Sequence, residues 1–201
     1  MFYCIIHKPY GVLSQFSAAD GKQVLKDFFD VPGDVYPVGR LDADSEGLLV
    51  LTNDPSLNRA LLHPSTAHPR EYWVQVDGAV TLQALSKLEQ GVQITIDGKP
   101  YLTKPCRASI LQNATTESVF PPGVTKRDPP VRFRKEIPTS WIKLELTEGK
   151  NRQVRRMTAA VGLPTLRLIR YRIEQCTLEG LAPGEMRLYS RQSMYRLLNI
   201  H

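Results

Sequence analysis

Apolar runs separated by short turn-forming stretches extend along most of the chain, and their lengths predict more strands than helices. Residues 2–6 (FYCII) and 48–52 (LLVLT) are continuous apolar runs, which is typical of buried strands. Other stretches alternate or are bounded by turn residues, and these predict further strands: an edge strand with Pro37 at 35–38, a strand at 71–78, a hairpin over 92–111, and strands at 140–149 and 165–173.

Helical spacing is limited to a few short stretches. Residues 20–30 place Val24, Leu25, Phe28 and Phe29 on one side and predict a short helix. Two further helices carry end signals: Asp54 and Pro55 begin one that ends near Leu62, and Thr81 begins one that ends at Gln90 before Gly91. Residues 151–162 and the tail at 190–200 complete the set. Many strands with few helices predict an α+β fold with a large mixed sheet.

Residues 112–138 differ in character from the rest of the chain. They contain five prolines and little periodicity. Such a stretch predicts an exposed loop or an insertion between two strands.

Composition limits the class of protein. The chain has 201 residues and 42% hydrophobic content, which suits one domain or two small lobes, and no apolar run reaches the length of a membrane span. Cys4, Cys106 and Cys176 are far apart and form no CxxC motif, and there are only four histidines. We therefore expect reduced thiols, no metal centre, no membrane association and a cytoplasmic location.

Charge is distributed unevenly. Residues 1–125 hold 10 Lys and Arg against 13 Asp and Glu, whereas residues 126–201 hold 16 against 7. Most of the basic residues in the second part are arginines, whose planar guanidinium groups bind phosphate in a bidentate manner. The pattern favours a polyanionic partner such as nucleic acid, and the alternative is a solvated basic surface with no partner.

One turn combines an arginine with several carboxylates. In VYPVGRLDADSEGLLVLTND (35–54), Arg40 lies two residues before Asp42, and Asp44 and Glu46 follow. A turn needs Asp and Gly but does not need the arginine. An ionised Asp42 would be able to act as a covalent nucleophile, although its charge alone does not distinguish it from Asp44 or Glu46.

A second candidate group lies in EGKNRQVRRM (148–157). Lys150, Arg152, Arg155 and Arg156 gather where a strand ends and a helix begins, and cations at a helix N-terminus oppose the helix dipole. The cost is offset when an anion binds there, so a phosphate backbone or a buried carboxylate such as Asp42 is favoured over a solvated helix end.

These motifs, in their order and spacing, resemble one family. GRLDADSEGLLVLTND, REYWVQVDG and EGKNRQVRRMTAAVG with TLRLIRYRI are similar to the bacterial rRNA pseudouridine synthases of the branch typified by the small-subunit enzyme A. The resemblance covers about residues 2–187, and the Pro-rich stretch looks most like members that act on large-subunit RNA. It implies a catalytic domain over 1–187 with the loop 112–138, and leaves a tail at 188–201 that is predicted to be helical.

The resemblance also assigns residues. It implies that Asp42 is the nucleophile beside Arg40, that Tyr72 is the active-site tyrosine, and that Arg155 pairs with the carboxylate and keeps it ionised. Leu168 falls on the apolar pocket position. Lys150, Arg152 and Arg156 would bind the RNA together with Arg40, and Arg155 has the alternative role of a phosphate contact.

The implied fold is a two-lobed core around a central, largely antiparallel sheet, without the small RNA-binding domain that precedes the core in most relatives. Isomerising a uridine breaks the C1′–N1 bond, rotates the base and rejoins it through C5, so no cofactor and no metal is expected. The base must be flipped out of the RNA, and Tyr72 would stack on it. HKPYG (7–11) departs from the family pattern, because His7 replaces an asparagine.

Two other functions stay open. One is modification of small-subunit rRNA or tRNA instead of large-subunit rRNA. The other is a non-catalytic rRNA chaperone, which the positive charge of residues 126–201 supports equally well. The intact GRLD motif argues against the chaperone, because binding alone needs no aspartate there. We expect ribosomal RNA as the partner of a monomer, since no heptad pattern or apolar seam is visible.

Overall fold

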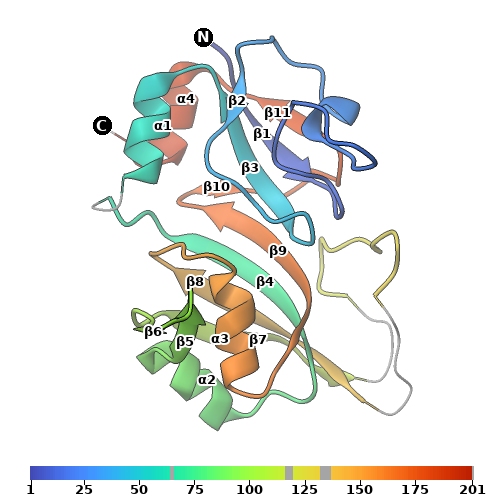
Figure 1. The fold of residues 1–201 in the computed structure, drawn as a ribbon, viewed down its shortest axis with the longest axis vertical. Coiled ribbons are helices and arrows are strands. Elements are labelled where there is room, and N and C mark those ends of the chain that lie inside the picture. Colours follow the sequence, from blue (N-terminus) through green and yellow to red (C-terminus); the bar gives the residue numbers. More distant parts are fainter. Residues whose placement is uncertain (64–65, 116–119, 132–136, 201) are drawn as a thin grey trace. The chain divides into compact units, whose positions relative to one another are not determined.

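The computed structural model describes residues 1–63, 66–115, 120–131 and 137–200, and it contains eleven strands and four α-helices in these ranges (Figure 1). The chain divides into two compact units. Unit 1 comprises residues 1–68 and 169–201, and unit 2 comprises residues 69–168. The prediction of an α+β fold with a mixed, largely antiparallel sheet is confirmed. Within the described ranges, no helix has the length and apolar character needed to cross a membrane.

The sheet of unit 1 is mixed. Strand β1 (Tyr3–Lys8) pairs antiparallel with β3 (Glu46–Thr52) on one side and with β11 (Met186–Leu188) on the other. Strand β3 also pairs parallel with β9 (Thr165–Ile173), whose residues from Ile169 onward belong to this unit. The short strands β2 (Tyr36–Pro37) and β10 (Cys176–Thr177) pair antiparallel with β3 and β9. Every residue of β1 and β3 is buried. The apolar runs predicted this for residues 3–6 and 48–52, whereas Phe2 precedes β1 and is partly exposed.

Two helices of unit 1 meet at one carboxylate. Asp54 caps α1 (Pro55–Leu62) by accepting hydrogen bonds from the N–H groups of Ser56 and Leu57, as the sequence predicts. Its second oxygen accepts from the hydroxyl of Tyr3 at 2.8 Å and from the hydroxyl of Tyr195 at 2.7 Å. Tyr195 lies on α4 (Arg191–Leu197), so the tail at 188–201 contains a helix that packs on unit 1.

The prediction of a helix over residues 20–30 is wrong. Only Leu25–Asp27 forms a single 3₁₀ turn. The backbone groups that a helix would use are bonded elsewhere, because the N–H of Leu13 donates to the carbonyl of Gln23 and the N–H of Leu25 donates to the carbonyl of Gln15. The apolar spacing therefore arises from core packing of an irregular segment and not from a helical face.

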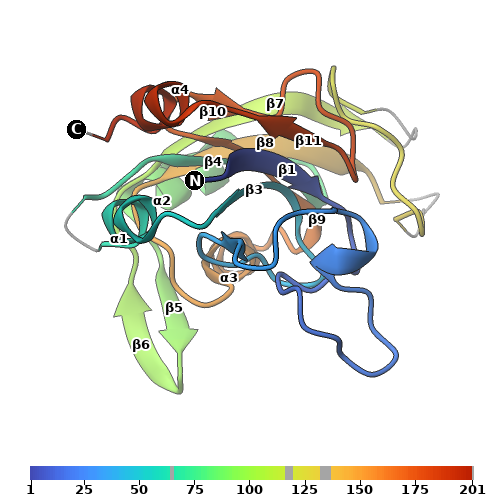
Figure 2. The ribbon, with the colours of Figure 1, turned by 90° about the horizontal axis from the view of Figure 1, so that it is seen from above.

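Unit 2 contains a three-stranded antiparallel sheet and a separate hairpin. Strand β8 (Thr139–Leu146) pairs with β4 (Arg70–Asp77) and with β7 (Arg107–Thr115). The predicted hairpin is β5 (Gln93–Ile96) with β6 (Lys99–Leu102), a two-stranded sheet of its own that Figure 2 shows apart from the other three strands. Residues predicted as its second half continue after Pro105 into β7.

Two helices cover the core of unit 2. Helix α2 (Leu82–Gln90) is capped by Thr81 and closed by Gly91, as the sequence predicts. Helix α3 (Gln153–Ala160) begins two residues later than expected. Both contribute to one apolar cluster with the sheet, and its members include Val74, Leu88, Leu144 and Met157.

The loop predicted over 112–138 is partly corrected. Residues 112–115 continue strand β7, because their backbone pairs with β8. Residues 120–131 contain no helix or strand, as predicted, and the segments 116–119 and 132–136 lie outside the described residues.

Two of the three arginines of β9, Arg167 and Arg170, are buried, although both count toward the positive charge of residues 126–201. Arg167 is 1% exposed and lies about 6 Å from the rings of Phe120 and Trp141, and it donates to the carbonyl of Thr125 at 2.8 Å. Arg170 is 6% exposed. These two cations support the fold and add little to the basic surface.

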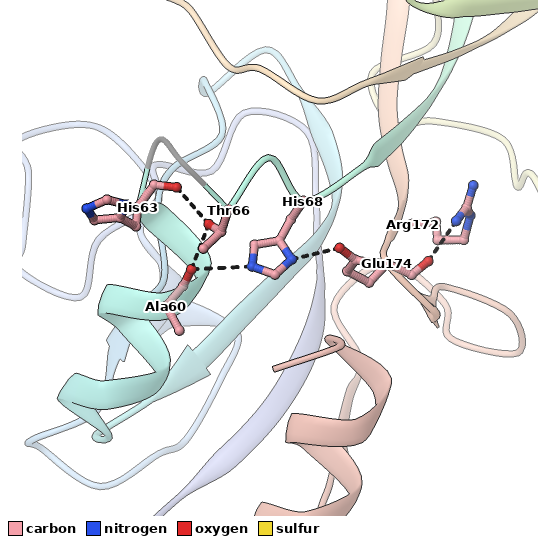
Figure 3. A network of polar contacts seen from close by, with 6 residues as sticks. All are labelled: Ala60, His63, Thr66, His68, Arg172 and Glu174. Carbon is pink, nitrogen blue, oxygen red and sulfur yellow. Dashed lines mark hydrogen bonds and ion pairs between the residues drawn. The ribbon is translucent and has the colours of Figure 1, made fainter. Parts of the chain in front are cut away.

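A buried histidine fixes the point where the chain leaves unit 1. His68 is the last residue of the first segment, and its ring contacts Glu174 Oε1 at 2.7 Å and the carbonyl of Ala60 at 3.3 Å (Figure 3). The backbone of Glu174 is held in turn by Arg172, which donates to its carbonyl. Each ring nitrogen thus lies within hydrogen-bond distance of an oxygen of unit 1.

Candidate active site

The predicted nucleophile lies in a turn whose backbone is held from behind. This aspartate turn, residues 39–46, begins with Gly39 and leads into β3. Arg40 is exposed, Leu41 is buried and Asp42 is partly buried. The backbone carbonyl of Asp42 accepts a hydrogen bond from the N–H of Ser45 at 3.0 Å, which closes the turn.

Residues 8–14 bind the aspartate turn through its main chain. The hydroxyl of Ser14 accepts from the N–H of Leu41 at 3.0 Å and donates to the carbonyl of the same residue at 2.8 Å. The N–H of Gly11 donates to the carbonyl of Ala43 at 2.8 Å. Both neighbours of Asp42 are therefore held through their main chains, which limits the freedom of the backbone that carries Asp42.

Lys8 places a buried cation beside this turn. Its side chain is fully buried, and Nζ donates to the carbonyls of Val12 at 2.7 Å and Pro9 at 2.9 Å. Burial lowers the pKa of Lys8 to about 8, although the charges of Glu46, Asp44 and Asp42 oppose the shift. Sequence reasoning singled out HKPYG only for its histidine and missed this lysine.

The glycine that follows the carboxylates, Gly47, is required by the close approach of two strands. It has φ +116° and pairs with Arg170 across the parallel strands β3 and β9. A Cβ at this position would lie 2.4 Å from the carbonyl oxygen of Arg170, so only glycine allows the two strands to approach. Arg170 then donates from Nε to the carbonyl of Leu48 at 2.8 Å. Sequence reasoning treated Gly47 as a turn residue.

His7 has a structural position. The side chain is 6% exposed, and Nδ1 lies 2.9 Å from the carbonyl of Leu181. Its main chain bonds to Gly184 and Glu185, which precede β11. The departure from asparagine at this position therefore concerns the packing of the 181–185 turn.

The four predicted basic residues gather at the start of α3 in unit 2. Arg152 is the N-cap and has left-handed backbone angles, φ 50° and ψ 30°. Lys150 and Arg152 are exposed, and Arg155 and Arg156 are partly exposed in the first turn of the helix. No acidic residue lies in that turn, so the helix dipole is not compensated from within.

Tyr72 and Leu168 lie with α3 on one face of unit 2. Along β4, Tyr72 alternates with buried Val74 and Val76, and its ring packs against the apolar cluster of the unit. Leu168 on β9 and Val154 on α3 are members of the same cluster. Tyr72, Leu168 and Val154 thus contact one apolar cluster of unit 2, and Val154 lies on the helix that the basic residues begin.

The candidate residues fall into two groups. Unit 1 carries Arg40 and Asp42 in the aspartate turn, and unit 2 carries Tyr72, Leu168 and the basic start of α3. Among the residues that the structure describes, no three His, Cys, Asp or Glu side chains are grouped so that they would hold a metal ion.

Comparison with known proteins defines the class. Residues 2–160 match the family described as RNA pseudouridylate synthase, and the chain belongs to this family. It is an enzyme of the isomerase type, which confirms the resemblance seen in its motifs.

Particular relatives make the placement narrower. The chain is 48% identical over 181 residues to ribosomal large subunit pseudouridine synthase E of Vibrio parahaemolyticus, covering 90% of this chain and 71% of the relative. It is 50% identical over 181 residues to the protein of the same name in Xanthomonas axonopodis pv. citri, covering 89% of each. Among solved structures, a pseudouridylate synthase superposes with a TM-score of 0.75 at 26% identity, over 98% of this chain and 73% of the other.

Proposed function

We propose that this protein converts a uridine of large-subunit ribosomal RNA to pseudouridine. The relatives named above are similar along most of their length and are large-subunit synthases, which supports this RNA over small-subunit rRNA or tRNA. The observation that carries the proposal is the aspartate turn, in which hydrogen bonds to Leu41 and Ala43 hold Asp42 within the family motif.

The proposed chemistry uses three side chains. Asp42 attacks the uridine at C1′ or at C6, the bond between C1′ and N1 breaks, and the base rotates. A bond then forms between C1′ and C5, and the bond from Asp42 to C1′ or C6 breaks, which returns the free carboxylate. The C5 proton leaves and N1 takes up a proton, so the atoms balance without a redox partner. Tyr72 stacks on the flipped base, and its hydroxyl is placed to accept the C5 proton. Arg155 pairs with the Asp42 carboxylate.

RNA binding is assigned to the basic start of α3. Lys150, Arg152 and Arg156 bind the phosphate backbone there, where the helix N-terminus adds its own favourable dipole. Arg40 contributes from the aspartate turn, and Leu168 forms the apolar side of the base pocket. The protein acts as a monomer in the cytoplasm, in the branch typified by the small-subunit enzyme A.

The test is site-specific pseudouridine mapping on large-subunit rRNA transcripts and on immature large subunits. The wild-type protein is expected to modify one uridine, and Asp42→Asn is expected to form no product while binding the RNA with unchanged affinity. Asn keeps the shape of the side chain but is not a nucleophile. Normal product formation by Asp42→Asn would remove this residue from the chemistry.

The same assay separates the other functions. New pseudouridine only in small-subunit rRNA or tRNA would identify that RNA as the substrate. RNA binding without product on any substrate would support the chaperone function.

A further inference from the structure

A carboxylate at the first position of the basic segment 148–157 accepts three hydrogen bonds. Glu148 Oε2 accepts from the hydroxyl of Tyr101 at 2.6 Å. Its Oε1 accepts from the backbone N–H of Lys104 at 2.9 Å and from the side-chain amide of Gln153 at 2.6 Å. The donors come from the hairpin strand β6, from the residues after it, and from the first residue of α3.

The same contacts close the turn that precedes α3. The amide oxygen of Gln153 accepts from the N–H of Lys150 at 2.9 Å, so Glu148, Gln153 and Lys150 form one chain of hydrogen bonds around the turn. Gln153, in the middle of this chain, is 4% exposed, whereas Glu148 is partly exposed and Lys150 is exposed. The ammonium of Lys150 lies 5.2 Å from the centre of the Tyr101 ring, a cation–π distance.

The turn that this chain encloses is strained. Arg152 has φ 50°, a region in which a Cβ crowds the carbonyl oxygen that follows. This turn brings cationic side chains close together and contains a left-handed residue. Both features are unfavourable, so contacts with neighbouring residues must stabilise the turn. The hydrogen bond to Glu148 also raises the pKa of Tyr101, so the hydroxyl stays a donor at neutral pH.

We propose that Glu148 is a positioning residue for RNA binding. Through Tyr101, Lys104 and Gln153 it holds the turn 148–152 so that Lys150 and Arg152 present their charges to phosphates along one path. This role rests on the proposed function. It gives a negatively charged residue a positive effect on RNA affinity.

Substitution of Glu148 separates positioning from simple charge repulsion. In Glu148→Gln the amide oxygen can still accept from Lys104 and Gln153, and the amide nitrogen can donate to the hydroxyl of Tyr101. In Glu148→Ala all three contacts are lost. Positioning therefore predicts that the Gln variant behaves like the wild type and that the Ala variant fails, whereas repulsion predicts that both bind RNA more tightly.

The experiment measures binding of an in vitro transcript of large-subunit rRNA at several salt concentrations, together with pseudouridine formation. For Glu148→Ala we expect about tenfold weaker binding, a salt dependence shallower by about one phosphate contact, and a fall in kcat/KM that comes mainly from KM. For Glu148→Gln we expect values within about twofold of the wild type. A loss of folding alone would not change the salt slope of the folded fraction.

Two controls complete the design. Glu145→Ala removes the same charge three residues earlier on β8, where the partner is the exposed Arg107 at 3.4 Å, and it is expected to leave RNA binding unchanged. Tyr101→Phe removes one of the three hydrogen bonds without a change of charge at neutral pH and serves if the Ala variant does not fold. A smaller loss of affinity is expected for this variant.

The outcomes distinguish this proposal from the proposed function. A wild-type protein that neither binds rRNA nor forms pseudouridine would overturn both. A wild-type protein that does both, with a Glu148→Ala variant that binds as tightly and with the same salt slope, would overturn only the role of Glu148.

Discussion

The left-handed backbone at Arg152 predicts that two substitutions of this residue differ in stability but weaken RNA binding equally. A Cβ at φ 50° and ψ 30° crowds the carbonyl that follows, at a cost of about 1–2 kcal/mol. Arg152→Ala retains this Cβ, and Arg152→Gly removes it. Glycine also gains freedom in the unfolded chain, which offsets part of the difference. We expect the free energy of unfolding of the Gly variant to exceed that of the Ala variant by about 1 kcal/mol.

Arg156 provides a matched control in the same helix. It lies inside α3 with helical backbone, where glycine is less stable than alanine by about 0.5–1 kcal/mol. The order of the Gly and Ala variants should therefore reverse between positions 152 and 156. Urea unfolding with equal m values measures both differences.

RNA binding supplies the second half of this prediction. Both Arg152 variants lack the guanidinium, so both should bind the rRNA transcript about equally weakly, whatever their stability. An Ala variant as stable as the Gly variant would contradict the left-handed conformation. Undiminished RNA binding by both variants would remove Arg152 from the proposed interface.

Two further predictions concern the residues behind the aspartate turn. Gly47→Ala should lower the free energy of unfolding by about 3 kcal/mol or more in urea, because its Cβ would meet the Arg170 carbonyl at 2.4 Å, whereas Gly33→Ala, with nothing within 4 Å, should not. Because the pKa of Lys8 falls from 10.5 to about 8 on folding, the unfolded state binds more protons between these pH values, so stability rises with pH there. Urea unfolding should show the wild type gaining roughly 2.5 kcal/mol over Lys8→Met between about pH 7 and pH 10, and a constant difference would show that the carboxylates outweigh burial.

Much of the fold could be predicted from local signals. The buried strands β1 and β3 follow from continuous apolar runs, and the limits of α1 and α2 follow from Asp54 with Pro55 and from Thr81 with Gly91. Each of these signals acts between residues a few positions apart. The segment 20–30 failed because its backbone bonds to residues 13–15, which local spacing does not reveal.

The candidate site also contains residues that the sequence indicated and residues that only the structure revealed. Its motif residues, from Asp42 and Tyr72 to Arg155, were chosen from the sequence through resemblance to the family, and their catalytic roles stay a proposal. The residues that support them were missed. Ser14 and Lys8 act on the aspartate turn from about thirty residues away in the chain, and Glu148 gathers donors from β6 and α3.

The sequence by itself thus determined the class of strands and helices, the family and the chemical groups that are present. The tertiary structure decided which of those groups are exposed at the surface and which are buried and stabilise the fold. Arg167 and Arg170 counted toward a basic surface in the sequence but are buried against aromatic rings and carbonyl groups. The reason is physical: propensity and capping depend on neighbours in the chain, whereas burial, close approach at Gly47 and the three contacts of Glu148 depend on segments that only folding brings together.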